Sequence, residues 1–180
     1  LPAIIEAWYP GQAGGTAIAD VIFGDYNPAG RLPVTFYKDI NDIPPFSEYD
    51  MKGKTYRYFK GDPLYEFGYG LSYANFTYRN VELPQSIAAG EELILTVEVE
   101  NTSSLKGEEV IQVYVQNPNA DDKNPHKTLA AFDRVAFEAG EKKSLVFKIN
   151  KEQLSMVNKQ GEKVIVPGTY EISVGGRQPS

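Results

Sequence analysis

The protein has 180 residues, of which 42% are hydrophobic and 23% are charged, and its net charge is -6. This composition is that of a folded globular protein and excludes wholesale disorder. The acidic balance argues against a nucleic-acid partner, because a protein that grips phosphates usually needs a basic face. The sequence holds no run of about 18 apolar residues, no Cys and a single His. We therefore expect no membrane span, no disulfide, no metal centre and no cofactor.

The first elements in chain order are a strand and a helix. Residues Leu1 to Ala7 predict a buried strand, because the two adjacent isoleucines are apolar and β-branched. A short helix is expected from about Gly14 to Phe23, and Gly24 suits the position that follows a helix end. The apolar residues that share one face of this helix are Ala17, Ile18, Val21 and Ile22. A strand followed by a helix is half of an α/β unit.

The stretch from Asp25 to Tyr73 has almost no regular period and is rich in aromatic residues and Pro. Residues 1–79 hold 17 of the 22 aromatic residues of the chain. A loop of roughly fifty residues does not fold alone as a compact domain. We therefore interpret residues 1–75 as the tail of a larger α/β domain, lying on a surface that this chain lacks or supplies only in part. The sequence starts without Met or a signal peptide, so we expect a piece of a longer protein.

Residues 76–180 have the pattern of an all-β domain. Apolar and polar residues alternate in four runs, which are centred on residues 93–99, 111–115, 145–149 and 170–174. Weaker strands near 76–83, 129–137 and 163–166 bring the total to about seven strands in about 100 residues. This count and spacing favour an immunoglobulin-like or fibronectin type III-like sandwich. The glycines expected to form turns between the runs are Gly90, Gly107, Gly140, Gly161 and Gly168.

Several polar groups offer candidate chemistry beside a simpler structural explanation. The Gly-rich stretch from Gly11 to Gly15 lies between strand and helix, but it lacks the phosphate-loop spacing and its Lys, which favours a tight turn. Four carboxylates lie among aromatic residues, where a retaining glycosidase pair is conceivable. We expect them instead to cap turns or to pair with Lys52, Lys54 and Arg57; they are Glu48, Asp50, Asp62 and Glu66.

Aromatic residues are densest in Tyr56–Phe59 and Tyr65–Tyr73. These stretches either pack loops onto a neighbouring domain or line a sugar site. His126 is expected to be a solvated loop residue, and the preceding Asp121 and Asp122 are possible cation ligands without the EF-hand pattern. Two tripeptides match the N-glycosylation acceptor, and they start at Asn75 and Asn101.

Three long motifs, in this order and spacing, closely resemble glycoside hydrolase family 3. They are AWYPGQAGGTA at 7–17, VIFGDYNPAGRLPVT at 21–35 and LYEFGYGLSYANF at 64–76. The stretch EYDMKGKTYRYF at 48–59 looks most like the β-xylosidase and β-glucosidase branches. Residues 129–140 resemble a strand pair of the family's C-terminal fibronectin type III-like domain, so the resemblance covers nearly the whole chain.

The resemblance implies an α+β fragment: the tail of an α/β-sandwich domain over 1–75, followed by an all-β fibronectin type III-like sandwich over 76–180. The family's activity is that of a retaining exo-β-glycosidase, commonly secreted or periplasmic. Its Asp nucleophile comes from an N-terminal barrel, in a Ser-Asp motif that occurs nowhere in this chain. Its acid/base Glu lies upstream of the motif that begins here at Trp8, and Glu6 is too close to match it. The resemblance thus places both catalytic carboxylates outside this chain.

Three functional hypotheses follow. The first is the C-terminal segment of such a glycosidase, inactive alone, which completes the sandwich domain and adds a structural β-domain. Its partners would be the N-terminal barrel, the rest of the sandwich domain and a β-linked oligosaccharide. The second is a stand-alone carbohydrate-binding module, which requires a platform of exposed aromatic residues on the β-domain. The third is a purely structural or protein-interaction domain. No residue of this chain is assigned to substrate or metal binding.

Overall fold

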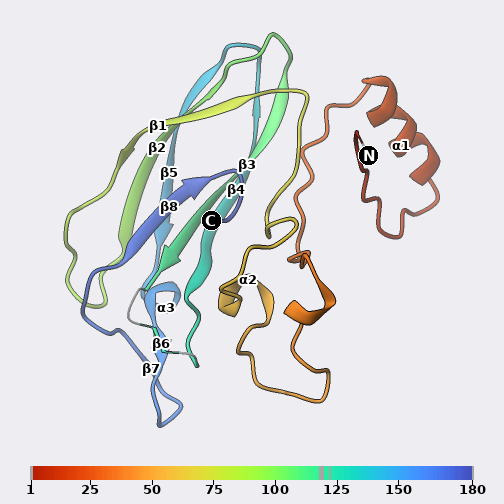
Figure 1. The fold of residues 1–180 in the computed structure, drawn as a ribbon. Coiled ribbons are helices and arrows are strands. Elements are labelled where there is room, and N and C mark those ends of the chain that lie inside the picture. The colour runs from red at the N-terminus through yellow and green to blue at the C-terminus, as the bar shows by residue number, and fades with distance from the viewer. Residues whose placement is uncertain (1, 118–119, 122, 180) are drawn as a thin grey trace.

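Two antiparallel sheets form a β-sandwich, and the chain that precedes them winds along one of its sides (Figure 1). This computed structural model describes residues 2–117, 120–121 and 123–179. The first sheet has the order β1-β2-β5, from β1 (Phe76–Glu82), β2 (Leu93–Asn101) and β5 (Lys142–Ile149). The second has the order β4-β3-β8, from β3 (Gly107–Gln116), β4 (Lys127–Phe137) and β8 (Glu171–Gly175).

A small α/β addition lies at one end of the sandwich (Figure 1), where Asn117 and Asn124 hydrogen-bond to it. It consists of α3 (Lys151–Leu154) and a two-stranded sheet of β6 (Met156–Val157) and β7 (Lys163–Val164). Asn150 and Gln153 cap α3 reciprocally through side chain and backbone. The strands that the sequence predicted in residues 76–180 are all present, whereas α3 and β6 are too short to produce a recognisable period.

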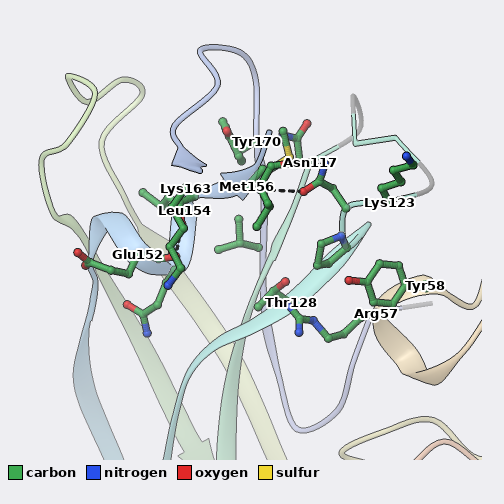
Figure 2. Close-up of a pocket in the computed structure, with 16 residues that line it drawn as sticks. Arg57, Tyr58, Asn117, Lys123, Thr128, Glu152, Leu154, Met156, Lys163 and Tyr170 are labelled. Atoms are coloured by element: carbon green, nitrogen blue, oxygen red, sulfur yellow. Dashed lines mark hydrogen bonds between the residues drawn. The ribbon is translucent and has the colours of Figure 1, made fainter. Parts of the chain in front are cut away.

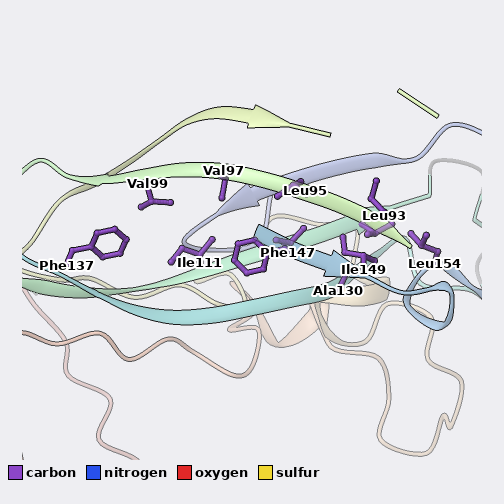
Figure 3. Close-up of a cluster of buried hydrophobic side chains, with 12 residues drawn as sticks. Leu93, Leu95, Val97, Val99, Ile111, Ala130, Phe137, Phe147, Ile149 and Leu154 are labelled. Atoms are coloured by element: carbon purple, nitrogen blue, oxygen red, sulfur yellow. The ribbon is translucent and has the colours of Figure 1, made fainter. Parts of the chain in front are cut away.

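The core lies between the sheets and follows from the alternation along β2 (Figure 3). Leu95, Val97 and Val99 are fully buried, and they face Ile111 and Val113 of the opposite sheet. The register sets Leu93, Leu95 and Val97 opposite Ile149, Phe147 and Leu145 of β5. Because every second residue faces inward, a local sequence pattern is sufficient to build this core.

Strand β3 departs from simple alternation, because it is buried on both faces. Ile111, Val113 and Val115 point inward, yet the intervening Gln112 and Tyr114 are only 2% and 0% exposed. An outward-facing Tyr without exposure requires a cover on the outside of the sheet. Residues before 76 supply this cover, which confirms that the chain provides part of the surface on which they lie.

The region before β1 contains three short helices. They are α1 (Gly14–Phe23), the 3-10 helix Ile40–Asp42 and α2 (Thr55–Tyr58). The predicted helix is confirmed at both ends, and Gly24 ends it in the left-handed conformation with a φ of 85°. A Cβ on Gly14 would lie 2.4 Å from Pro10 Cβ, so the first helical turn requires Gly there.

Two expectations from sequence are wrong. Residues 2–7 form no strand, because a strand needs a hydrogen-bonding neighbour and no described segment pairs with them; Ile4 and Ile5 are 65% and 50% exposed. Leu1 lies outside the described residues. Gly107 forms no turn but opens β3, where a Cβ would lie 2.7 Å from Ala74 Cβ. The other four predicted turn glycines do adopt positive φ.

Candidate functional site

The most highly organised polar site is a set of three anchors that fasten residues 25–75 to the sandwich. The first anchor is an ion pair between Arg31 and Glu109 of β3, with 2.7 Å between Nη2 and Oε2 and side chains only 9% and 4% exposed. Tyr78 of β1 donates its hydroxyl to the other oxygen of Glu109 at 2.9 Å. The Glu109 carboxylate therefore links Arg31 to a residue of each sheet, because Glu109 lies on β3 and Tyr78 on β1.

The remaining donors of Arg31 are also used. Its Nε donates to the carbonyl of Gly176 at 3.3 Å, and Nη1 donates to the carbonyls of Ala29 and Gly30 at 3.2 Å each. Burial raises the pKa of Tyr78 far above its ordinary value, and the adjacent negative charge of Glu109 raises it further. The hydroxyl therefore stays protonated and continues to donate to the carboxylate.

The second anchor is centred on Gln112, on the outer face of β3. Its amide nitrogen donates to the carbonyls of Gly68 at 3.1 Å and Gly176 at 2.7 Å. Its amide oxygen accepts a 2.6 Å hydrogen bond from the hydroxyl of Tyr114, whose pKa is raised by burial. Gly68 has a φ of 78°, and a Cβ there would lie 2.0 Å from the Gln112 oxygen, so this close approach requires Gly.

The third anchor is aromatic and is formed by side chains of residues 56–73. Tyr56 stacks on Phe67 with 4.1 Å between ring centroids and meets Tyr114 edge-on at 6.1 Å. The hydroxyl of Tyr56 accepts a 3.0 Å hydrogen bond from the backbone of Leu129. These aromatic residues were expected either to pack loops onto a neighbouring domain or to line a sugar site. Tyr56 and Phe67 pack onto the neighbouring domain.

Three of the four candidate carboxylates have separate structural partners, and the fourth residue, Glu48, is contacted through its backbone. Glu66 lies 3.7 Å from Arg177, and Asp62 lies 3.7 Å from Lys38. Asp50 accepts the backbone N–H of Lys52 at 2.8 Å, and Lys54 donates to the backbone carbonyl of Glu48. The expected turn capping is thus seen at Asp50, but Lys38 and Arg177 had not been foreseen. Among the described residues, no group of three or more His, Asp or Glu side chains is placed to hold a metal ion.

Hydrogen bonds hold the described residues that precede β4, which the sequence had not indicated. The Asp121 carboxylate accepts from the Asn124 side chain at 2.9 Å and from the Asn124 and Lys123 backbones, and these bonds hold its pKa below the ordinary value. Asp122 lies outside the described residues. His126 is half-buried rather than solvated, and its backbone N–H donates to the Arg57 carbonyl at 2.8 Å.

The two glycosylation tripeptides differ in access. The Asn101 side chain is fully buried and donates to the carbonyls of Leu105 at 2.7 Å and Glu138 at 3.1 Å. Asn75 is exposed. Only Asn75 therefore remains open to modification in the folded state.

Large apolar side chains are exposed on the region before β1. Tyr9 is 100% exposed, Phe23 81%, Phe46 99% and Tyr49 92%, and α1 projects away from the sandwich (Figure 1). Exposed aromatic residues in this number indicate contact with another body of protein. In contrast, Tyr114, Phe137 and Phe147 of the sandwich are buried, and Phe132 is its exposed Phe at 66%. The described sandwich thus has no aromatic platform, which argues against a carbohydrate-binding module of that kind.

Sequence reasoning had missed Arg31, Glu109, Tyr78 and Gln112. One signal was available: Glu109 interrupts the apolar alternation of β3 on its inward face, where a carboxylate requires a partner. No helix in the described part of the chain is both long and apolar enough to cross a membrane.

Two families match the chain. Residues 1–73 match the Glycosyl hydrolase family 3 C-terminal domain, and residues 109–178 match the Fibronectin type III-like domain. The Xylan 1,4-beta-xylosidase of Xylanibacter ruminicola is 44% identical over 96% of this chain and 20% of its own length. The Periplasmic beta-glucosidase of Salmonella typhimurium is 38% identical over 96% of this chain and 24% of its own length.

Solved structures agree with these relatives. The beta-glucosidase from Listeria innocua superposes with a TM-score of 0.82 at 37% identity, covering 96% of this chain and 26% of that one. The GH3 beta-glucosidase of Bifidobacterium adolescentis gives a TM-score of 0.83 at 31% identity over 96% and 27%. The chain spans only about a quarter of such proteins or less. By sequence and by fold, the chain is similar to the C-terminal part of family 3 glycoside hydrolases, and its residues 1–73 belong to that family's C-terminal domain.

Proposed function

We propose that this chain is the C-terminal segment of a retaining exo-β-glycosidase that hydrolyses terminal β-glucosyl or β-xylosyl residues. The observation that carries the proposal is the 44% identity to a protein named Xylan 1,4-beta-xylosidase, which extends over 96% of the chain. The likeness to proteins named beta-glucosidase extends equally far, so both sugars remain within the proposal.

Catalysis would depend on carboxylates supplied by the rest of the polypeptide. Double displacement needs a nucleophile and an acid/base about 5–5.5 Å apart in one site. Here Asp62 and Glu66 are each beside a basic side chain, and Asp50 caps a turn. We therefore assign no catalytic residue to this chain and expect it to be inactive alone.

The role of the chain would be structural, with residues 1–75 completing the α/β-sandwich domain and residues 76–180 forming the fibronectin-like domain. The anchors at Arg31, Gln112 and Tyr56 support this division, because they join the two parts through buried contacts. The exposed faces of Phe23 and Phe46 would pack against the barrel and the rest of the sandwich domain. Secretion or periplasmic placement is supported by the name of one relative.

The proposal is tested by activity and by assembly. The complete polypeptide should hydrolyse an aryl β-glucoside or β-xyloside, and the isolated chain should release no aryl group. When the chain and the remainder are produced as separate pieces, Phe23→Ser should weaken their association. The matched control is Phe132→Ser, which removes an exposed Phe from the sandwich surface and should leave association unchanged.

Two results would contradict the proposal. Turnover by the pure 180-residue chain would mean that it contains its own catalytic carboxylates. A complete polypeptide that hydrolyses neither aryl glycoside would remove the assigned activity.

A further inference from the structure

A cavity of about 330 Å³ opens at the end of the sandwich that carries α3, β6 and β7 (Figure 2). Its walls come from α2, from the ends of β3 and β4, and from the α3, β6 and β7 addition. Leu154, Met156 and Tyr170 contribute apolar surface. This volume lies within the range of pockets that hold small ligands, about 300–1,000 Å³.

One wall of this cavity carries a buried donor without a partner. The Nε of Arg57 is inaccessible to solvent and makes no hydrogen bond. The residue itself is fixed: its backbone N–H donates to Thr55 Oγ1 at 3.3 Å, and its carbonyl accepts from His126 at 2.8 Å. Figure 2 shows its guanidinium directed toward Thr128 in the cavity. Because Nε itself is closed to solvent, an acceptor in the cavity would meet the terminal nitrogens of the guanidinium.

The other charges around the cavity favour an anionic acceptor. Arg57, Lys123 and Lys163 line it, whereas Glu152 is its one acidic lining residue among those described. This local excess of positive charge stands out in a chain whose net charge is -6. The carboxylate of Glu152 lies 4.0 Å from the ammonium of Lys151, a residue that does not line the cavity.

Two side-chain amides that line the cavity already have hydrogen-bond partners within the protein. They therefore hold the shape of the cavity. Asn124 binds both the N–H and the carbonyl of Val157, at 3.0 and 3.2 Å. Asn117 donates to the sulfur of Met156 at 3.2 Å. Recognition is thus left to the guanidinium, the ammonium groups and the ring of Tyr58, whose centroid lies 6.0 Å from the guanidinium carbon of Arg57.

We propose that this cavity binds a sugar that bears a carboxylate, with Arg57 receiving the carboxylate and Lys163 adding positive charge. The planar guanidinium matches the geometry of a carboxylate, and the volume and apolar wall suit one pyranose ring. The carboxylate follows from the cavity alone, and the sugar rests on the proposed glycosidase function.

The test is isothermal titration calorimetry of the complete polypeptide at pH 7, in a buffer without carboxylate or phosphate. D-glucuronate should bind saturably, while D-glucose, acetate and inorganic phosphate should bind at least tenfold more weakly. Arg57→Gln should weaken glucuronate binding by about tenfold or more, because it removes a charge-assisted hydrogen bond. Lys163→Gln is the second variant, because it lies on β7 and acts through charge without altering α2.

The matched control is Lys159→Gln, which removes an exposed positive charge between β6 and β7 at a residue that does not line the cavity. The affinity of this variant for glucuronate should equal that of the unmodified protein. Equal binding of acetate or phosphate would overturn the sugar assignment, and equal binding of glucose would overturn the carboxylate. Absence of saturable glucuronate binding, or full affinity in both cavity variants, would overturn the site itself. None of these readouts depends on turnover, so they are separate from the test of glycosidase activity.

Discussion

Removal of the Glu109 carboxylate should be far more damaging than removal of its sequence neighbour. In Glu109→Ala the Arg31 guanidinium, 9% exposed, loses its carboxylate partner. Breaking a buried pair in this way typically costs about 3–5 kcal/mol. The three carbonyls that still accept from Arg31 place the ionic part at the low end of that range.

A second loss falls on Tyr78, whose hydroxyl would be left without its acceptor. An unsatisfied buried hydroxyl costs about 1–3 kcal/mol. Glu109→Ala should therefore reduce the free energy of unfolding by about 4–6 kcal/mol. Glu109→Gln keeps an acceptor for Tyr78, so it should cost only the ionic part, about 3 kcal/mol.

The assay is urea unfolding followed by far-UV circular dichroism. The control is Glu108→Ala, because Glu108 pairs with Arg134 at the surface, where the side chains are 37% and 52% exposed. Exposed pairs contribute about 0.2–1 kcal/mol. The double variant Arg31→Met/Glu109→Met should lose much less than the sum of its single changes, since neither charge is left alone. A cost for Glu109→Ala no greater than that for Glu108→Ala, or strict additivity in the double variant, would refute this reasoning.

Three further predictions use the same unfolding measurement. Leu95→Ala, at a fully buried core position, should cost about 2–5 kcal/mol, and a loss below 1 kcal/mol would mean that the sheets do not pack as described. Gly68→Ala forces a left-handed φ on Ala and displaces the Gln112 amide, so it should cost about 2 kcal/mol or more. Its control is Gly90→Ala, which has a φ of 96° but no atom within 4 Å of the added Cβ; equal costs would argue against the Gln112 contact. Because the folded state raises the pKa of Tyr78, its contribution should be complete below pH 10.0 and decline as the pH rises above that value. The stability advantage of the unmodified protein over Tyr78→Phe should shrink between pH 9 and pH 11, and a constant difference would contradict a buried, titrating hydroxyl.

Elements whose signals are local can be predicted from the amino-acid sequence. The strands of the sandwich follow from alternation over five to nine residues, as in β2, where each apolar residue of the inward face is buried. Helix α1 follows from its apolar face and from Gly24, which alone among common residues accepts a φ of 85° without strain. The motifs at 7–17, 21–35 and 64–76 identified the family, because a long ordered set of residues is improbable by chance.

The contacts that join the two parts of the chain cannot be predicted from local patterns. Arg31 and Glu109 are 78 positions apart, and no period or spacing in a sequence connects residues at that distance. The place of Tyr114 in the alternation of β3 predicts an exposed side chain on the outer face of the sheet. It is fully buried because another part of the chain covers it. The strand expected before Ala7 is absent for the converse reason: its apolar residues have no neighbouring strand among the described residues. Local patterns specify which face of an element is apolar, whereas the backbone pairing and the covering partner depend on contacts between distant segments.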